Sequence, residues 1–246
     1  MLGALRSGKY DPDTVVCGLA KSECDCRLAH YAALGRKALD EAGYSQVPII
    51  TTDRDNKGMH PAFSLGMKFQ LRAMWGLNMG DVLEHIRRRL RPYELVPGQT
   101  EEIFQESVRR IAAALRRSIR AALREFDAAL DKFAAMPADL RKRRPRVFVI
   151  GEFLLNFHAG SNNYLEKYLE DHGMEVVLPD AFAPMHRDYM KKDAEARLFW
   201  VKYPFLDMFT NNVTIALIDQ TKRAMARRLK KLPFMQVPIS LRELAA

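Results

Sequence analysis

Apolar residues in the first third of the chain recur first at helical and then at strand spacing. Positions three and four residues apart predict a helix over 31–42, which Gly43 is placed to end. The run VPIITT at 47–52 is rich in β-branched residues and predicts a strand. A second helical pattern follows through Leu90 and stops at Pro92. This order of helix, glycine turn and strand is typical of an α/β fold.

The middle of the chain carries one apolar stripe at helical spacing for about eight turns. Thr100 is a good N-cap, and Glu101 and Glu102 suit the positive end of a helix dipole. Pro137 ends the pattern. The stripe therefore predicts one long helix over 97–137 that joins two lobes or packs along both. A coiled-coil dimer is the alternative, because the spacing alternates between three and four residues.

The last section reads as a strand, a loop, a helix and a second strand. RVFVIG at 146–151 has the pattern of a buried strand, and MEVVLPD at 174–180 predicts the next one. Between them Ser161 is expected to cap a helix that Gly173 ends. Such a βαβ unit implies a parallel sheet, in which ligands gather beyond the carboxyl ends of the strands. The loop 151–163 is therefore the best-placed functional segment.

Four polar residues of this loop are candidates for a binding site. Glu152 follows the strand and is expected to point into the crevice. Ser161, Asn162 and Asn163 stand at the predicted helix start, where an anion or phosphate is favoured. An ordinary capped connection explains the same residues, and no GxGxxG fingerprint is present. His158 is the histidine of most interest, although a surface or hydrogen-bonded role is favoured over a catalytic one.

Three cysteines, Cys17, Cys24 and Cys26, lie within ten positions and are the only ones in the chain. Cys24, Cys26 and His30 are able to meet at a metal, yet they match no strong zinc spacing. Inert or merely reactive thiols are the alternative. Cys26 is the best placed to be a thiolate, because it lies near a helix start beside Arg27. Thiolates are the ligands that hold iron–sulfur clusters.

Composition and charge limit the class of protein. The 246 residues are 48% hydrophobic and 28% charged, enough for one large domain or two smaller ones. The formal charge of +9 is spread over amphipathic helices, which favours solvated faces over a nucleic-acid partner. No apolar run reaches the roughly 18 residues of a membrane span, and the clustered cysteines are unlike a secreted disulfide scaffold. We therefore expect a cytoplasmic protein with no membrane partner and with reduced thiols.

Three stretches, taken in order, point to one family. They are YDPDTVVCGLAKSECDCRLAHYAALGRKALDEAGYSQVPII from Tyr10, RPYE at 91–94, and RVFVIGEFLLNFHAGSNNYLEKYLEDHGMEVVLP from Arg146. The Cys-Arg turn and the Gly-Glu…Ser-Asn-Asn unit carry most of the signal. Together the stretches resemble the 2-hydroxyacyl-CoA dehydratase-like proteins, above all the C-terminal dehydratase-like portions of the large CoA-enzyme activase proteins. The resemblance covers nearly the whole chain.

The resemblance implies an iron–sulfur chemistry. Members of this family hold [4Fe-4S] or double-cubane clusters on cysteines and receive low-potential electrons from an ATP-driven activator. Their typical substrates are acyl-CoA thioesters. The position that matches the family's Cys-Arg cysteine is Cys26, which becomes a candidate cluster ligand. Cys24 is a weaker candidate, since relatives more often have glycine there, and Cys17 inherits no role.

Together these observations predict an α/β chain of two Rossmann-like lobes with parallel sheets. The expected parts are a first lobe over 1–96, the connecting helix over 97–137, and a second, apparently truncated lobe over 145–246. The chain would be a portion of an iron–sulfur protein, inactive alone, whose other cluster ligands and activator lie in an upstream half or a partner. Whether it is itself an enzyme is left open. The alternative is a non-catalytic α/β module that holds an anionic partner on its basic helices and at Ser161.

Overall fold

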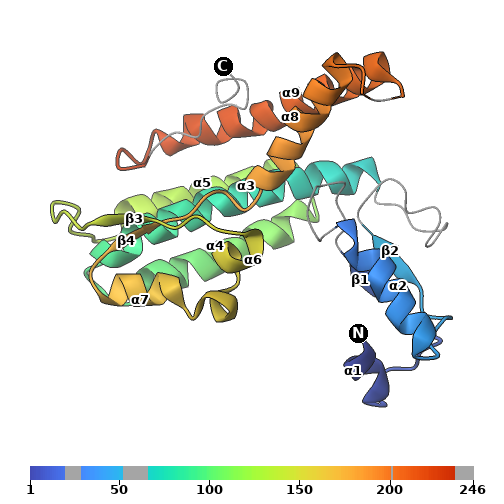
Figure 1. The fold of residues 1–246 in the computed structure, drawn as a ribbon. Coiled ribbons are helices and arrows are strands. Elements are labelled where there is room, and N and C mark those ends of the chain that lie inside the picture. The colour runs from blue at the N-terminus through green and yellow to red at the C-terminus, as the bar shows by residue number, and fades with distance from the viewer. Residues whose placement is uncertain (20–28, 52–65, 201, 236–246) are drawn as a thin grey trace. The chain divides into compact units, whose positions relative to one another are not determined.

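The chain is mostly helical, with two small parallel sheets of two strands each, and is α/β in this broad sense (Figure 1). The computed structural model describes residues 1–19, 29–51, 66–200 and 202–235, with the backbone alone for 184–188. It divides into two compact units, Met1–Gln70 and Leu71–Ala246. The three-part division expected from the sequence stays a prediction.

The first unit contains a parallel strand pair with a helix between its strands. Its elements are α1 (Leu2–Arg6), β1 (Cys17–Leu19), α2 (Tyr31–Glu41) and β2 (Ile49–Thr51). Cys17 lies opposite Ile49 in the sheet. The core consists of Leu5, Ala32, Leu39, Val47 and Ile49. The helix and the second strand were expected, whereas β1 was not.

The glycine turn between α2 and β2 forms as predicted. Gly43 has a φ of +81°, a conformation that glycine adopts without strain. The N–H of Tyr44 then donates to the carbonyl of Leu39 at 2.8 Å, which satisfies a carbonyl at the helix end. Arg36 fixes the turn by donating to the carbonyls of Val47 at 2.6 Å and Tyr44 at 3.1 Å.

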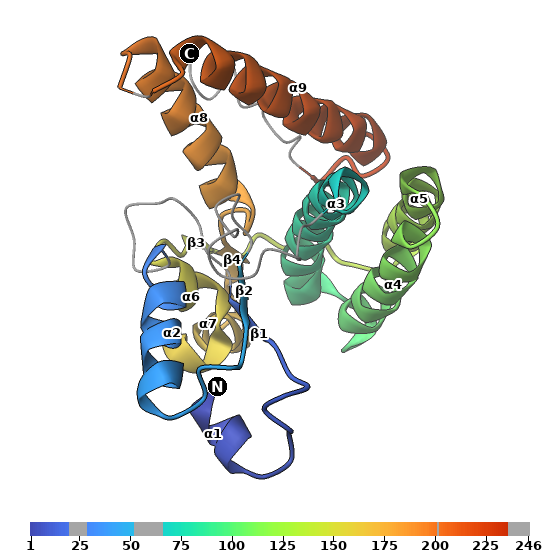
Figure 2. The ribbon, with the colours of Figure 1, turned by 90° about the vertical axis from the view of Figure 1, so that its right-hand side faces the viewer.

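The second unit combines a helical layer with a small sheet. Its helices are α3 (Met67–Leu90, beginning in the first unit), α4 (Gln99–Leu115), α5 (Ile119–Ala135), α6 (Phe153–Phe157), α7 (Leu165–Asp171), α8 (Ala183–Arg197) and α9 (Pro204–Leu229). The short turns are η3 (Arg91–Tyr93) and η4 (Ala159–Asn162), and the strands are β3 (Arg146–Phe148) and β4 (Glu175–Val177). Figure 2 shows α3 beside the α4–α5 pair, and side chains from α3, α4, α5 and α9 form the main core.

The single helix predicted over 97–137 is wrong, since the segment folds into two helices packed against each other. Arg110 of α4 pairs with Glu125 of α5 at 2.7 Å, and Glu106 pairs with Lys132, so the helices are antiparallel. The apolar side chains of the stripe are therefore packed between α4 and α5, and the segment does not form one helix that bridges two lobes. At the break the backbone of Ser118 is extended, with φ −165° and ψ 159°.

The start of α4 also differs from the expectation. Thr100 is buried inside the helix and does not cap it. The cap comes from the carboxylate of Glu94, which accepts the N–H groups of Gly98 at 2.6 Å and Thr100 at 2.9 Å. The left-handed φ of +86° at Gly98 lets the chain turn back toward Glu94. The RPYE stretch therefore ends in a helix cap.

Ser118 and Ser161 provide a matched pair for testing which serine caps a helix. Ser118 accepts the N–H of Ala121 at 3.0 Å, whereas Ser161, predicted to be a cap, lies within η4 and contacts His158. We expect Ser118→Ala to lower the free energy of unfolding by about 1 kcal/mol. Ser161→Ala is expected to change it by less than about 0.5 kcal/mol. Urea denaturation measures both, and equal effects would contradict the assignment.

The predicted βαβ unit of the second half is confirmed at the level of its strands. β3 and β4 pair in parallel, with Arg146 opposite Glu175 and Phe148 opposite Val177. Gly173 ends α7 with a φ of +79°. Because the strands are parallel, the segments that follow them emerge at the same edge of the sheet.

Candidate functional site

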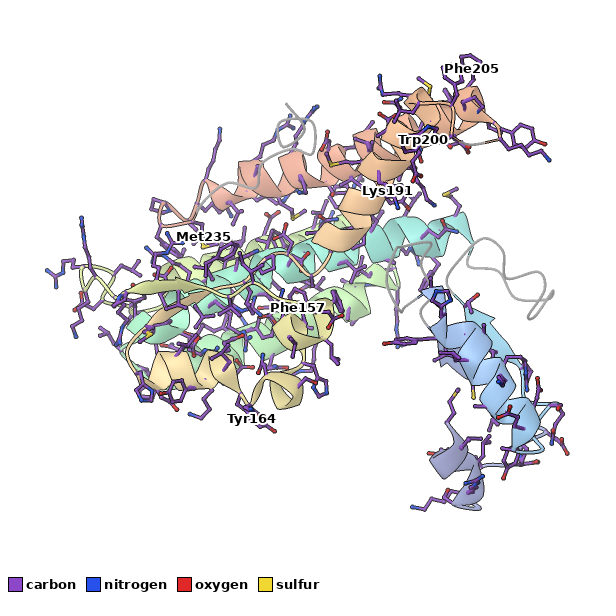
Figure 3. All side chains as sticks on the ribbon, in the orientation of Figure 1. Phe157, Tyr164, Lys191, Trp200, Phe205 and Met235 are labelled. Carbon is purple, nitrogen blue, oxygen red and sulfur yellow. The ribbon has the colours of Figure 1, made fainter. Side chains whose placement is uncertain are left out.

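A pocket of about 430 Å³ lies in the second unit, between α3 and the segments that follow β3 and β4. The segment after β3 contributes Asn156, Phe157, Ala159 and Asn162, and the segment after β4 contributes Pro179 and Ala181. Phe157 and the nearby Tyr164 are labelled in Figure 3. The opposite wall is a charged row on α3. The pocket thus lies at the carboxyl edge of the parallel strands, where ligands bind in α/β folds.

Asn156 lines the pocket and contains a buried acceptor that has no partner. Its side chain is 93% buried, and its amide donates to the carbonyl of Gly151 at 3.2 Å. Its Oδ1 has no hydrogen-bond partner. A buried acceptor left unmatched costs about 1–3 kcal/mol, so a ligand N–H or O–H would be stabilised here. The sequence interpretation missed Asn156, because nothing distinguishes it from the polar loop residues around it.

Asn162 is the one of the four predicted binding residues that lines the pocket. Its amide donates to the carbonyl of Leu155 at 2.8 Å, and its Oδ1 accepts the N–H of Leu165 at 3.1 Å. These two bonds tie the loop after α6 to the first turn of α7. Asn162, and not Ser161, therefore provides a side-chain acceptor for the first N–H of α7.

The other predicted loop residues lie elsewhere. Glu152 is exposed and caps α6, accepting the N–H of Leu154 at 2.8 Å. Asn163 has a left-handed φ of 56° where η4 ends. The Nδ1 of His158 accepts the N–H of Ser161 at 3.1 Å. Ser161 therefore begins no α-helix, and an anion site on a helix dipole at this position is not supported.

His85 and Asp180 form a hydrogen-bonded pair at the pocket. The Nε2 of His85 lies 2.6 Å from the Oδ1 of Asp180, which follows β4. Asp81, one turn before His85 on α3, accepts the N–H groups of Ala181 and Phe182, each at 3.0 Å. Asp81 therefore holds the turn that presents Asp180. A carboxylate hydrogen-bonded to an imidazole fixes the orientation of the ring, so His85 is placed to exchange a proton with a ligand.

The carboxyl of Asp81 is expected to titrate unusually high. Burial raises its pKa to about 6, with the Asp180 charge adding to the rise and the two backbone hydrogen bonds opposing it. Because this pKa exceeds the unfolded value, the stabilisation is complete below about pH 4 and is lost as the pH rises through 6. We expect the carboxyl ¹³C chemical shift of Asp81 to titrate with a midpoint near pH 6. Asp81→Asn should remove the matching fall in unfolding free energy between pH 4 and 7, and a midpoint near 4 would contradict the prediction.

The charged row on α3 is neutralised by carboxylates. Glu166 of α7 pairs with three arginines, Arg87, Arg88 and Arg91. Burial alone would raise the pKa of Glu166, but the three guanidinium groups outweigh it and lower the pKa below its ordinary value. Arg91 also pairs with Glu170 at 2.7 Å. This network fastens α7 to α3, and it leaves the pocket wall mixed in charge and not simply cationic.

The cysteine site predicted from the sequence falls largely outside the described residues. Cys24 and Cys26 lie there, so nothing here places them. Cys17 is a half-buried free thiol on β1, and His30 stands at the start of α2. Among the residues that the structure describes, no three His, Cys, Asp or Glu side chains converge as metal ligands. These residues therefore do not by themselves fit an iron–sulfur cluster.

Comparison with protein-family models, with curated proteins and with solved structures finds no match to this chain. The resemblance to the dehydratase-like proteins therefore rests on the residues that carry it and stays a prediction. Within the described part of the chain, no helix is both long and apolar enough to cross a membrane.

Proposed function

We propose that the chain is a portion of an iron–sulfur protein of the 2-hydroxyacyl-CoA dehydratase type, and that its second unit forms part of the substrate pocket. The observation that carries the proposal is the position of the pocket beyond β3 and β4. Two residues of the Gly-Glu…Ser-Asn-Asn unit, which carries much of the resemblance, line this pocket or contact its wall. Gly151 accepts from Asn156, and Asn162 lines the wall.

The pocket residues suit the acyl end of a 2-hydroxyacyl thioester. The substrate's hydroxyl is a donor that would match the unpartnered, buried Oδ1 of Asn156 once that side chain turns toward the pocket. His85, oriented by Asp180, would donate a proton to the hydroxyl as it leaves. The acyl group would fill part of the 430 Å³ volume, which is within the range of small-molecule sites.

The proposal extends to the architecture of the two units and to the partners of the chain. The two units would be Rossmann-like lobes whose sheets are completed outside this chain, and the second would be truncated. Cys26, and more weakly Cys24, would contribute to a [4Fe-4S] or double-cubane cluster that is otherwise held by an upstream half or partner. The cluster would supply low-potential electrons obtained from an ATP-driven activator. Alone, the chain would be inactive.

Anaerobic reconstitution with iron and sulfide tests this function. We expect the wild-type chain to bind iron that a mild chelator removes, because most ligands would come from outside. Cys26→Ser should abolish this binding, whereas Cys17→Ser should retain it. Iron and acid-labile sulfide contents are measured for all three proteins. Equal iron in the wild type and Cys26→Ser would remove Cys26 from the site and would contradict the iron–sulfur part of the proposal.

One observation favours the alternative, a binding module for an anionic partner. A smaller cavity of about 290 Å³ lies between α3 and α9, lined by Trp75, Arg223 and Arg227 among others. Neither arginine forms an ion pair within the described residues, whereas Arg228 on the same helix pairs with Asp127 at 3.0 Å. Two unpaired guanidinium groups beside an indole suit an anionic aromatic ligand. Binding at this cavity and not at the larger pocket would favour the module.

A further inference from the structure

One edge of β3 has no neighbouring strand within the described residues. The N–H of Val149 donates to the carbonyl of Val177 on β4 at 3.0 Å. The N–H and C=O of one strand residue point to the same edge, and successive residues alternate between the two edges, so those of Phe148 and Ile150 face away from β4. No described hydrogen bond uses their backbone N–H or C=O groups. An open edge of this kind is a template for a further strand.

The side chains along this edge are apolar and exposed. Phe148 is 59% exposed and Ile150 is 73% exposed. Phe153, Leu154 and Leu155 of the adjacent α6 are each about half exposed. Parallel strands occur almost only in sheets whose two faces are covered, and two strands alone are marginally stable in water. The run of exposed apolar residues therefore marks an interaction surface.

The backbone edge determines the shape of the partner. A helix satisfies its own N–H and C=O groups, so it has none to offer to those of Phe148 and Ile150. An extended segment offers both, in the manner of β-strand addition. Since β3 already pairs in parallel with β4, a parallel third strand continues the same sheet.

The charge beside the edge favours a different polypeptide over a second copy of this chain as the partner. Arg141, Lys142 and Arg143, all exposed, lie in the segment just before β3 and are separated from it by two residues. Asp139 is the carboxylate that pairs with the first two, at 3.5 and 3.7 Å. A second copy would bring the same cations, on a chain with a formal charge of +9. A strand with acidic residues at its start would instead be attracted.

We propose that the free edge of β3 receives a β-strand of a different polypeptide, which runs parallel to β3. This strand presents apolar side chains to Phe148 and Ile150 and acidic residues near Arg141–Arg143. The proposal rests on the strand edge, its exposed apolar side chains and the cations before it, so it stands or fails independently of the pocket and of the iron–sulfur function.

Site-specific photo-crosslinking in the producing cell tests this interface. The full chain carries p-benzoylphenylalanine at position 148, at position 150, or at Leu95, a 60% exposed control in a turn of the same unit. We expect positions 148 and 150 to crosslink to one segment of one partner, at residues two apart and in the same chain direction. Acidic residues should precede that segment, and the yield at position 95 should be at least tenfold lower.

A proline variant tests whether the outward N–H at position 148 is needed, and Phe148→Ala, which loses the same ring but keeps the N–H and should retain the crosslink, is its control. The N–H of Phe148 points outward, so Phe148→Pro leaves the pairing with β4 intact while blocking the edge. With a crosslinker at position 150, this variant should keep a wild-type circular dichroism spectrum and lose at least tenfold in crosslink. A persisting crosslink, crosslinks to a second copy of this chain, scattered sites, or none at position 148 would each overturn the proposal.

Discussion

Replacing Glu175 with alanine is expected to lower the free energy of unfolding of the second unit by about 3 kcal/mol. The side chain is 2% exposed on β4 and pairs with Arg89 and, at 3.0 Å, with Arg146. It also accepts the hydroxyl of Tyr93 at 2.9 Å. Its removal leaves these three groups without their acceptor. The expected loss is at the low end of the range for a broken buried pair, because both arginines keep partial contact with solvent.

Asp171→Ala is the matched control for Glu175. Asp171 pairs with Lys167 one turn away at 2.7 Å, and both side chains are exposed. Pairs of this kind contribute about 0.3–0.5 kcal/mol, so the change should be small. Urea denaturation followed by tryptophan fluorescence measures both variants, since both tryptophans of the chain belong to the second unit. A loss of unfolding free energy below about 1 kcal/mol for Glu175→Ala would show that the buried carboxylate does not hold β3, β4 and α3 together.

Phe126→Ala is expected to destabilise the second unit by about 3–5 kcal/mol. Phe126 is fully buried on α5, in the core shared by α3, α4, α5 and α9. Truncation removes most of the ring's contacts and leaves a cavity that four packed helices cannot close. The same fluorescence-detected urea denaturation measures the loss.

Val108→Ala is the control for Phe126. Val108 lies on the same predicted stripe but is 38% exposed on α4, so the expected loss is below about 1 kcal/mol. A continuous helix that bridged two lobes would expose both positions to similar degrees. Equal, small losses at Phe126 and Val108 would therefore contradict the antiparallel packing of α4 and α5.

The sequence was sufficient for features that depend on local chemistry. Gly43 and Gly173 end their helices because only local backbone geometry is involved. The β3–β4 pair was also predictable, since its apolar runs are bounded by turn residues. β1 was missed because its pairing with β2, about 30 residues further along the chain, is what defines it as a strand.

Features that depend on contacts distant in the sequence were mispredicted. Nothing near Ser118 breaks the helical pattern, yet folding the stripe back on itself buries more apolar surface than one extended helix. Arg72 stabilises that break by donating to the carbonyls of Arg116 at 3.0 Å and Arg117 at 3.1 Å. Thr100 was preferred over Glu94 as a cap because the cap from Glu94 requires the turn at Gly98.

The candidate site likewise combines a residue that local sequence predicts with residues that only distant contacts bring together. Asn162 was predicted from its motif and lines the pocket, whereas His85 was overlooked in favour of His158. His85 gains its interest from Asp180, which lies 95 residues away in the chain. Only the packing of α3 against the end of β4 brings these two together, and no local spacing signals it.

The most direct test of the proposed function is where a 2-hydroxyacyl thioester binds. Lactoyl-CoA is titrated into the ¹⁵N-labelled full chain, and backbone and side-chain amide shifts are followed by NMR. The account predicts changes at His85, Asn156 and Ala181, and their loss, with binding weakened at least tenfold, in Asn156→Ala. Shifts confined to Trp75, Arg223 and Arg227, or no shifts at all, would contradict it.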